Sequence, residues 1–154
     1  VREDMHSGSI SHLGVVVLPT LLALAQHHRV GGRDFIAATA VGYEVGGQIG
    51  RAVMDAELAR IFRPTGITGP VGAAAAGARM LGLDVDQIAS AVALGANTTA
   101  GFNQWAHTGG SEMFSTRRFS TSMPYSSNSP LVRSAIIGRM AGWKQPNQFD
   151  QYVR

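Results

Sequence analysis

The chain has 154 residues, of which 45% are hydrophobic and 15% are charged, a size and composition that suit one globular domain with a hydrophobic core. The absence of cysteine excludes disulfide bonds, thiolate metal sites and redox chemistry at sulfur, and it favours a cytoplasmic location. The longest apolar runs, residues 13–25 and 71–83, are too short or too rich in glycine to span a bilayer, and we expect no signal peptide. We therefore expect a soluble protein with no membrane partner.

The basic character of the chain comes from its last segment. Residues 1–113 carry seven Arg and nine acidic residues, whereas residues 114–154 carry five Arg, one Lys and the single acid Asp150. A basic segment can bind phosphate backbones, but no nucleic-acid motif accompanies this one, so we do not expect a nucleic-acid partner. We expect a helical core over residues 1–113 and a divergent basic tail over 114–154, both in one globular unit.

The first half of the chain has the apolar spacing of helices. Residues 13–28 predict a buried helix of about four turns, in which Pro19 is tolerable in the first turn or at a kink. Gly31 and Gly32 break this helix, and Asp34 favours a second helix that runs to about residue 54. Glycines recur every fourth residue at 42, 46 and 50, so they share one helix face. We interpret this face as a close helix contact, with a ligand groove as the alternative.

The second half also favours helices. Pro64 and residues 66–70 predict a loop, after which residues 71–81 predict an Ala-rich helix that Gly82 ends. Asp84 and Asp86 favour the start of another helix, which would run through residue 100. Residues 101–130 are irregular in pattern, and a last helix is predicted at 130–141. No alternating strand pattern competes, so the predicted fold class is all-α, a bundle of Ala- and Gly-rich helices.

Six short residue patterns follow one another along the helical region. They are residues 12–25 (His-Leu-Gly, then Val, Pro-Thr and Leu-Ala-Leu-Ala), 42–45 (Gly-Tyr-Glu-Val), 49–50 (Ile-Gly), 62–66 (Phe-Arg-Pro-Thr-Gly), 72–76 (Gly-Ala-Ala-Ala-Ala) and 81–84 (Leu-Gly-Leu-Asp). Their order and spacing over residues 1 to about 113 resemble the helical domain of the MmgE/PrpD family, which includes 2-methylcitrate dehydratase and cis-aconitate decarboxylase. The resemblance stops near Phe114, where the charge also shifts, and a change of reading frame is one hypothesis for this break.

The resemblance implies a lyase or isomerase that removes a proton next to a carboxylate of a small polycarboxylic acid. Such chemistry needs a base, an acid and cations that hold the carboxylates. The family pattern makes His12 a candidate active-site histidine, with His6 and Asp4 as further catalytic candidates. The substrate-binding candidates are Arg63, Thr65, Ser11 and His107. Trp105 and His107 either line a pocket beside Asn103 and Gln104 or belong to a packed loop.

Several residues depart from the family pattern. Arg63 stands where the family has a histidine, so this position can hold a carboxylate but cannot transfer a proton. Met5 replaces a threonine, and the lysine of decarboxylase-like members is missing.

These departures leave two alternative functions, a catalytically inactive, ligand-binding remnant or a helical module that self-associates. For the His12 side chain, the alternative to a site role is helix capping or packing. The five histidines lack ligand spacing, so we expect no metal and no cofactor, and we expect a homo-oligomer.

Overall fold

The computed structural model describes residues 4–110, and this part of the chain is helical and contains no β-strand. The all-α prediction is confirmed. The basic tail and its predicted helix at 130–141 lie outside the described residues. Within residues 4–110 no helix combines the length and apolarity that crossing a membrane requires. The elements are η1 (Ser7–Ser9), α1 (Gly14–His28), α2 (Gly32–Val53), α3 (Leu58–Ile61), α4 (Pro64–Met80), α5 (Val85–Ala96) and α6 (Trp105–Thr108).

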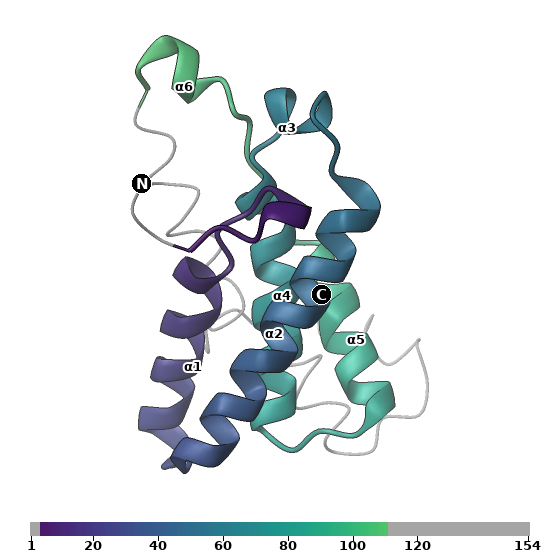
Figure 1. The fold of residues 1–154 in the computed structure, drawn as a ribbon. Coiled ribbons are helices and arrows are strands. Elements are labelled where there is room, and N and C mark those ends of the chain that lie inside the picture. Colours follow the sequence, from purple (N-terminus) through teal and green to yellow (C-terminus); the bar gives the residue numbers. More distant parts are fainter. Residues whose placement is uncertain (1–3, 111–154) are drawn as a thin grey trace, which may run out of the picture.

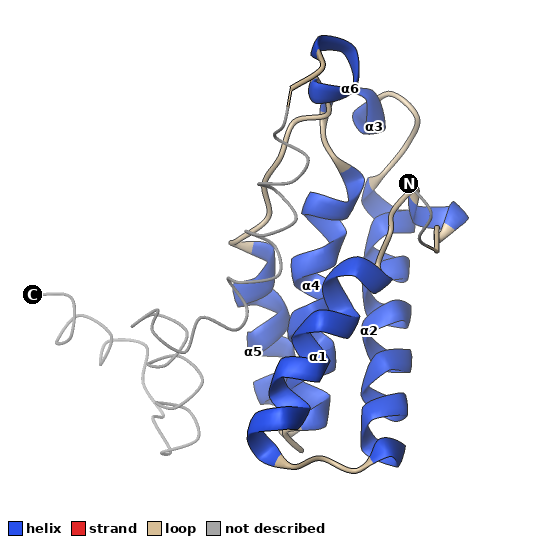
Figure 2. Ribbon diagram, turned by 90° about the vertical axis from the view of Figure 1, so that its left-hand side faces the viewer, coloured by secondary structure: helices blue, strands red, loops and turns tan. Residues whose placement is uncertain are grey.

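Four long helices, α1, α2, α4 and α5, run side by side, and the short helices α3 and α6 lie at one end of them (Figures 1 and 2). Helix α4 is the centre of the bundle, because it packs against α1, α2 and α5. Most of its residues are glycine, alanine and other small residues that are buried. The amino ends of α1 and α4 meet at the end of the bundle where α3 and α6 lie (Figure 1).

The contact between α2 and α4 depends on residues that lack side chains. A Cβ atom added at Gly72 would lie 2.7 Å from the carbonyl oxygen of Gly42, and one added at Gly42 would lie 2.8 Å from Ala76 Cβ. Gly46 meets the same helix, since its added Cβ would lie 3.4 Å from Gly72 Cα. The prediction that the glycine face of α2 is a close helix contact is confirmed.

The apolar core lies between α1, α2 and α4. Val17 and Leu21 of α1 are fully buried with Ala38 of α2 and Ala76 of α4. Burial of a valine or leucine side chain such as these stabilises the fold by about 1.5–3 kcal/mol relative to exposure. Pro19 lies on the exposed face of α1, in its second turn, where water can bind the carbonyl that proline leaves without a donor.

The predicted loop at residues 64–70 is wrong, because α4 already begins at Pro64. Pro64 suits the first helical position, where the missing N–H costs nothing. Pro70 lies inside the helix and cannot donate to the carbonyl of Gly66 four residues earlier. That carbonyl instead accepts a hydrogen bond from Ala100 N–H at 3.3 Å. A residue distant in sequence thus makes an interior proline tolerable in α4.

Two predictions in the last helical region were also inaccurate. Helix α5 ends at Ala96 rather than near residue 100, since the chain turns there to reach α4. The capping box at its start, in which Asp84 and Gln87 bond to each other's backbone N–H, confirms the predicted start. A short helix, α6, lies in the segment that was predicted to be irregular.

Substitution Gly72→Ala tests the glycine contact between α2 and α4. We expect a loss of about 1–3 kcal/mol in the free energy of unfolding, because the new methyl group overlaps a backbone carbonyl that cannot rotate away. Because alanine has a higher helix propensity than glycine, propensity alone would raise the free energy of unfolding, so a decrease must come from the overlap. Gly32→Ala is the matched control, since no heavy atom lies within 4 Å of an added Cβ there. Equal urea midpoints for both variants would contradict the proposed close contact.

Candidate functional site

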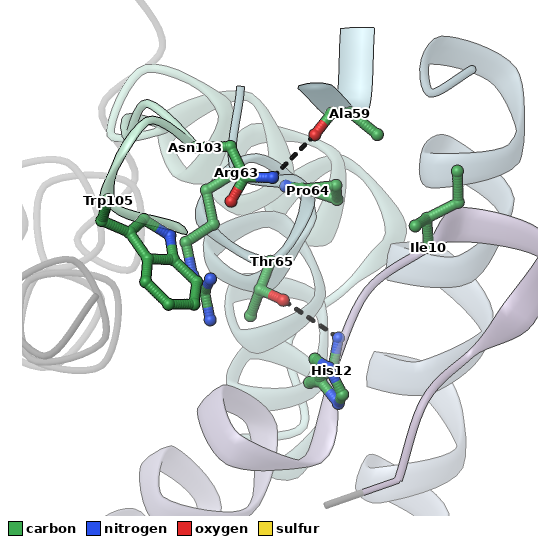
Figure 3. A pocket seen from close by; sticks show the side chains of 8 residues that line it. All are labelled: Ile10, His12, Ala59, Arg63, Pro64, Thr65, Asn103 and Trp105. Atoms are coloured by element: carbon green, nitrogen blue, oxygen red, sulfur yellow. Dashed lines mark hydrogen bonds between the residues drawn. The ribbon is translucent and has the colours of Figure 1, made fainter. Parts of the chain in front are cut away.

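A pocket of about 200 Å³ opens where the amino ends of α1 and α4 meet (Figure 3). Four chain segments build it: the loop before α1, the short helix α3, the first turn of α4 and the segment leading into α6. The residues that line it are Ile10, His12, Ala59, Arg63, Pro64, Thr65, Asn103 and Trp105. The structure therefore brings three of the predicted site residues, His12, Arg63 and Thr65, into one pocket.

His12 is held at two points. Its backbone N–H donates to Thr65 Oγ1 at 3.0 Å, and its ring Nδ1 lies 2.8 Å from the backbone oxygen of Asp4 (Figure 3 shows the bond to Thr65). A carbonyl oxygen can only accept a hydrogen bond, so Nδ1 must carry the proton. In the neutral ring, Nε2 then has the lone pair that can accept a proton. The N-cap position of α1 is Leu13 without a side-chain bond, so His12 does not cap this helix.

Arg63 occupies the N-cap position of α4 and is fixed against an aromatic ring. Its guanidinium carbon lies 5.0 Å from the centre of the Trp105 ring, a cation–π contact, and the two side chains lie against each other in Figure 3. The Trp105 Nε1 donor is buried and has no hydrogen-bond partner within residues 4–110. The stacking fixes the guanidinium at the pocket wall.

The segment before α6 is tied to the chain around α3. Asn103 donates from its backbone N–H to Ile61 O and from Nδ2 to Ala59 O, both at 2.8 Å. Phe62 and Phe102 stack with ring centres 5.7 Å apart. Trp105 is thereby held over Arg63 and lines the pocket, whereas His107 does not.

The electrostatic character of the pocket favours an anion. Arg63 contributes a full positive charge, and none of the residues that line the pocket is acidic. The amino ends of α1 and α4 add the partial positive charge of two helix dipoles. Carboxylates and phosphates are the anions that such an arrangement of arginine and helix ends binds best.

Tyr43 of α2 belongs to the surroundings of the site, and no sequence pattern predicted a role for it there. Burial raises the pKa of Tyr43 to about 12, and a hydrogen bond to the Asp4 side chain with repulsion from its negative charge adds to the shift. A Cβ added at Gly14 would overlap the Tyr43 hydroxyl and lie 2.5 Å from Asp4 Oδ1. Nothing in the sequence joins Tyr43 to Asp4, because they meet only when α2 packs beside α1.

Four predicted site residues, Asp4, His6, Ser11 and His107, lie outside the pocket lining. Asp4 is exposed, and its backbone oxygen accepts the hydrogen bond from His12 Nδ1. His6 Nδ1 is bonded to Ser9 Oγ at 2.8 Å, and its ring packs against Gly47 of α2. Ser11 is fully buried, where its hydroxyl shares a hydrogen bond of 2.5 Å with Ser9. His107 is exposed on α6. No group of three or more histidines and carboxylates able to hold a metal ion occurs in the described residues.

The tyrosine shift can be measured by absorbance titration of wild type and Tyr43→Phe. We expect the difference between the two curves to have its midpoint near pH 12 rather than at the ordinary value of 10.0. Because the folded pKa is the higher one, the stability that comes from the neutral phenol is fully present below pH 10 and is lost as the pH rises to 12. Asp4→Asn should lower the midpoint only partway, since burial remains. A midpoint at the ordinary value would contradict the described contact.

Comparison with known proteins identifies the family. The MmgE/PrpD N-terminal domain matches residues 2–117 of the chain. The cis-aconitate decarboxylase-like protein oryM of Aspergillus oryzae is 36% identical over 107 residues, which cover 64% of this chain and 22% of that protein. The chain thus spans about a fifth of the length of this relative, and no solved structure matches it significantly. Since the domain match includes most of the chain, the chain belongs to the MmgE/PrpD family.

Proposed function

We propose that the pocket binds a carboxylate of a small polycarboxylic acid and that His12 removes a proton from the carbon next to it, as in a lyase or isomerase reaction. The observation that carries the proposal is that His12 and Arg63 line the same pocket. One supplies a lone pair and the other a fixed positive charge, and proton abstraction next to a carboxylate requires both.

The pocket suits a small, charged ligand. Its volume of about 200 Å³ is below the range of about 300–1,000 Å³ for pockets that bind drug-sized molecules. The guanidinium of Arg63 can pair with both oxygens of a carboxylate, and the amino ends of α1 and α4 favour the same charge. Ile10, Ala59 and Pro64 provide an apolar wall for the carbon skeleton.

The proposed step is a dehydration in which one histidine moves the proton. His12 Nε2 takes a proton from the carbon next to the bound carboxylate, and the electrons of that C–H bond form a carbon–carbon double bond. The C–O bond to the neighbouring hydroxyl breaks, and the imidazolium passes its proton to the departing oxygen, which leaves as water. Arg63 stabilises the negative charge that builds up on the carboxylate in the transition state.

Family membership supports this class of chemistry at a coarse level. The relative from Aspergillus oryzae is described as cis-aconitate decarboxylase-like, and cis-aconitate is a small polycarboxylate. A reaction for the present chain remains our proposal, because the chain covers 22% of that relative. Arg63 in place of a family histidine favours a reaction in which His12 alone transfers protons in this pocket.

Calorimetric titration with citrate, cis-aconitate and methylcitrate tests the proposal. We expect saturable binding to the full chain that Arg63→Gln weakens about tenfold or more, since a charge-assisted hydrogen bond contributes about 1.5–3 kcal/mol. The His12→Gln variant should still bind the acid but should no longer form the double bond of the product, which is measured by its ultraviolet absorbance. His107→Ala is the matched control, because His107 is exposed and does not line the pocket. Absence of binding to wild type would overturn the proposal.

The surface of α1 supports a second candidate function, self-association. This helix contains no Asp, Glu, Lys or Arg, a composition typical of a helix that is covered on all sides. Leu18 and Leu22 are nevertheless 37% and 53% exposed, and their spacing places them on one face. We propose that the same face of a second copy covers them, because an uncharged surface does not repel its own copy.

Sedimentation velocity tests this second proposal. Wild type should sediment as a dimer or larger assembly, and Leu22→Glu should shift the chain to monomer, because a carboxylate would be buried in the contact. Val85→Glu is the matched control, since Val85 is 81% exposed and lies on α5. A monomeric wild type, or an equal effect of both substitutions, would contradict self-association through α1.

A further inference from the structure

The Asp4 side chain adds a contact between the loop before α1 and α2, beside the packing of the His6 ring on Gly47. The Asp4 carboxylate accepts a hydrogen bond from the Tyr43 hydroxyl, and the carbonyl oxygen of the same Asp4 accepts one from His12 Nδ1. Asp4 therefore has two bonding groups, of which one faces a rigid helix and the other faces the pocket histidine. The contact between Asp4 and Tyr43 lies outside the pocket in which Arg63 is proposed to bind a carboxylate, because neither Asp4 nor Tyr43 lines that pocket.

We propose that Tyr43 is a positioning residue for His12 and acts through Asp4. By holding the Asp4 side chain, the Tyr43 hydroxyl keeps the Asp4 carbonyl oxygen in line with His12 Nδ1–H. The proton is thereby kept on Nδ1, and Nε2 is the nitrogen with the free lone pair. This inference rests on the proposed function only in assigning a catalytic use to that lone pair.

The need for such a connection follows from the local structure. Asp4 is exposed and precedes η1 in a stretch without regular backbone hydrogen bonds, where a carbonyl group is free to turn unless its residue is tied down. Tyr43 lies in the middle of α2, whose glycine face is packed on α4. The bond to Tyr43 thus transfers the rigidity of the bundle to the carbonyl that orients the histidine ring.

Gly14 gives independent support for this contact. Any side chain at this first position of α1 would overlap the Tyr43 hydroxyl and the Asp4 carboxylate. Alanine has the higher helix propensity of the two residues. Glycine therefore leaves room for the Asp4–Tyr43 bond at a cost in local helix stability.

A role of Asp4 through its charge and a role through its bond to Tyr43 make different predictions. If Asp4 acted through its negative charge, Asp4→Asn and Asp4→Ala would have the same effect on His12. If Asp4 acts through the bond to Tyr43, Asp4→Asn retains an amide oxygen that accepts the hydrogen bond, whereas Asp4→Ala removes the acceptor. Asp4→Asn is therefore the conservative variant that separates positioning from charge.

The test is the tautomer of His12, read from the ¹⁵N chemical shifts of the imidazole nitrogens in the full chain at about pH 8, where an ordinary imidazole is neutral. We expect the wild-type ring to be protonated on Nδ1, the minor tautomer of free histidine. Tyr43→Phe, Asp4→Ala and Gly14→Ala should each shift the ring toward protonation on Nε2, and Asp4→Asn should retain the wild-type signal. His6 and His107 in the same spectra serve as controls and should not change.

Thermal unfolding of each variant separates positioning from loss of fold. Gly14→Ala keeps the proposal testable if Tyr43→Phe loosens α2, because alanine at the start of α1 favours the helix. Where the wild type shows turnover, kcat should fall about tenfold to a hundredfold in Tyr43→Phe, as for other partners that orient a histidine, with little change in KM.

Folded variants that keep the Nδ1–H tautomer would overturn the proposal, as would an Asp4→Asn spectrum that matches Asp4→Ala. Failure of the proposed function would give a different result. In that case, no acid would bind to the wild-type pocket, while the tautomer would still respond to Tyr43→Phe.

Discussion

The close approach of α2 and α4 is the contact on which the other positions depend. A methyl group on Gly72 would overlap the backbone of Gly42, so the distance between the two helices is set by backbone atoms rather than by adjustable side chains. Helix α4 in turn contacts α1 and α5. The distance between α2 and α4 therefore also fixes where the amino end of α1, and with it His12, lies relative to Arg63. A site that needs a base and an anion holder in one pocket depends on this spacing.

A second constraint arises from Pro70. The proline leaves the Gly66 carbonyl without its helical donor, and Ala100 supplies one instead. This bond draws the chain that leaves α5 along the first turns of α4, after which Arg63 N–H donates to Gly101 O at 3.0 Å. The segment that carries Asn103 and Trp105 is thus delivered to the pocket. An apparent defect inside α4 helps to build the wall that faces His12.

The sequence predicted most helices, because their signals are local. Gly31 is the N-cap of α2, which begins at Gly32, and Asp84 starts α5 through a capping box with Gln87. The start of α4 was mispredicted as a loop, since two prolines and two glycines in seven residues are typical of loops and the donor that satisfies the Gly66 carbonyl is remote in sequence. Local patterns cannot reveal a hydrogen bond between residues so far apart.

The site was only partly predictable for the same reason. The family resemblance pointed to His12, Arg63 and Thr65, which line one pocket. It also pointed to His6, whose backbone pairs with Ser11 beside His12 but whose ring packs against Gly47 and does not line the pocket. Tyr43 had no local signal, since its contact with Asp4 exists only after α1 and α2 pack together. Side chains that meet across elements are those that a single sequence identifies least well.

The stacking of Arg63 on Trp105 gives the pocket an optical property. The emission of an indole ring responds to nearby charge, and the guanidinium is 5.0 Å from the ring centre. An anion that pairs with Arg63 partly neutralises that charge, so occupancy of the pocket should be coupled to fluorescence without any added dye. The chain has two tryptophans, so replacing Trp143 would leave Trp105, which lines the candidate site, as the single tryptophan whose emission can be followed apart from that of tyrosine.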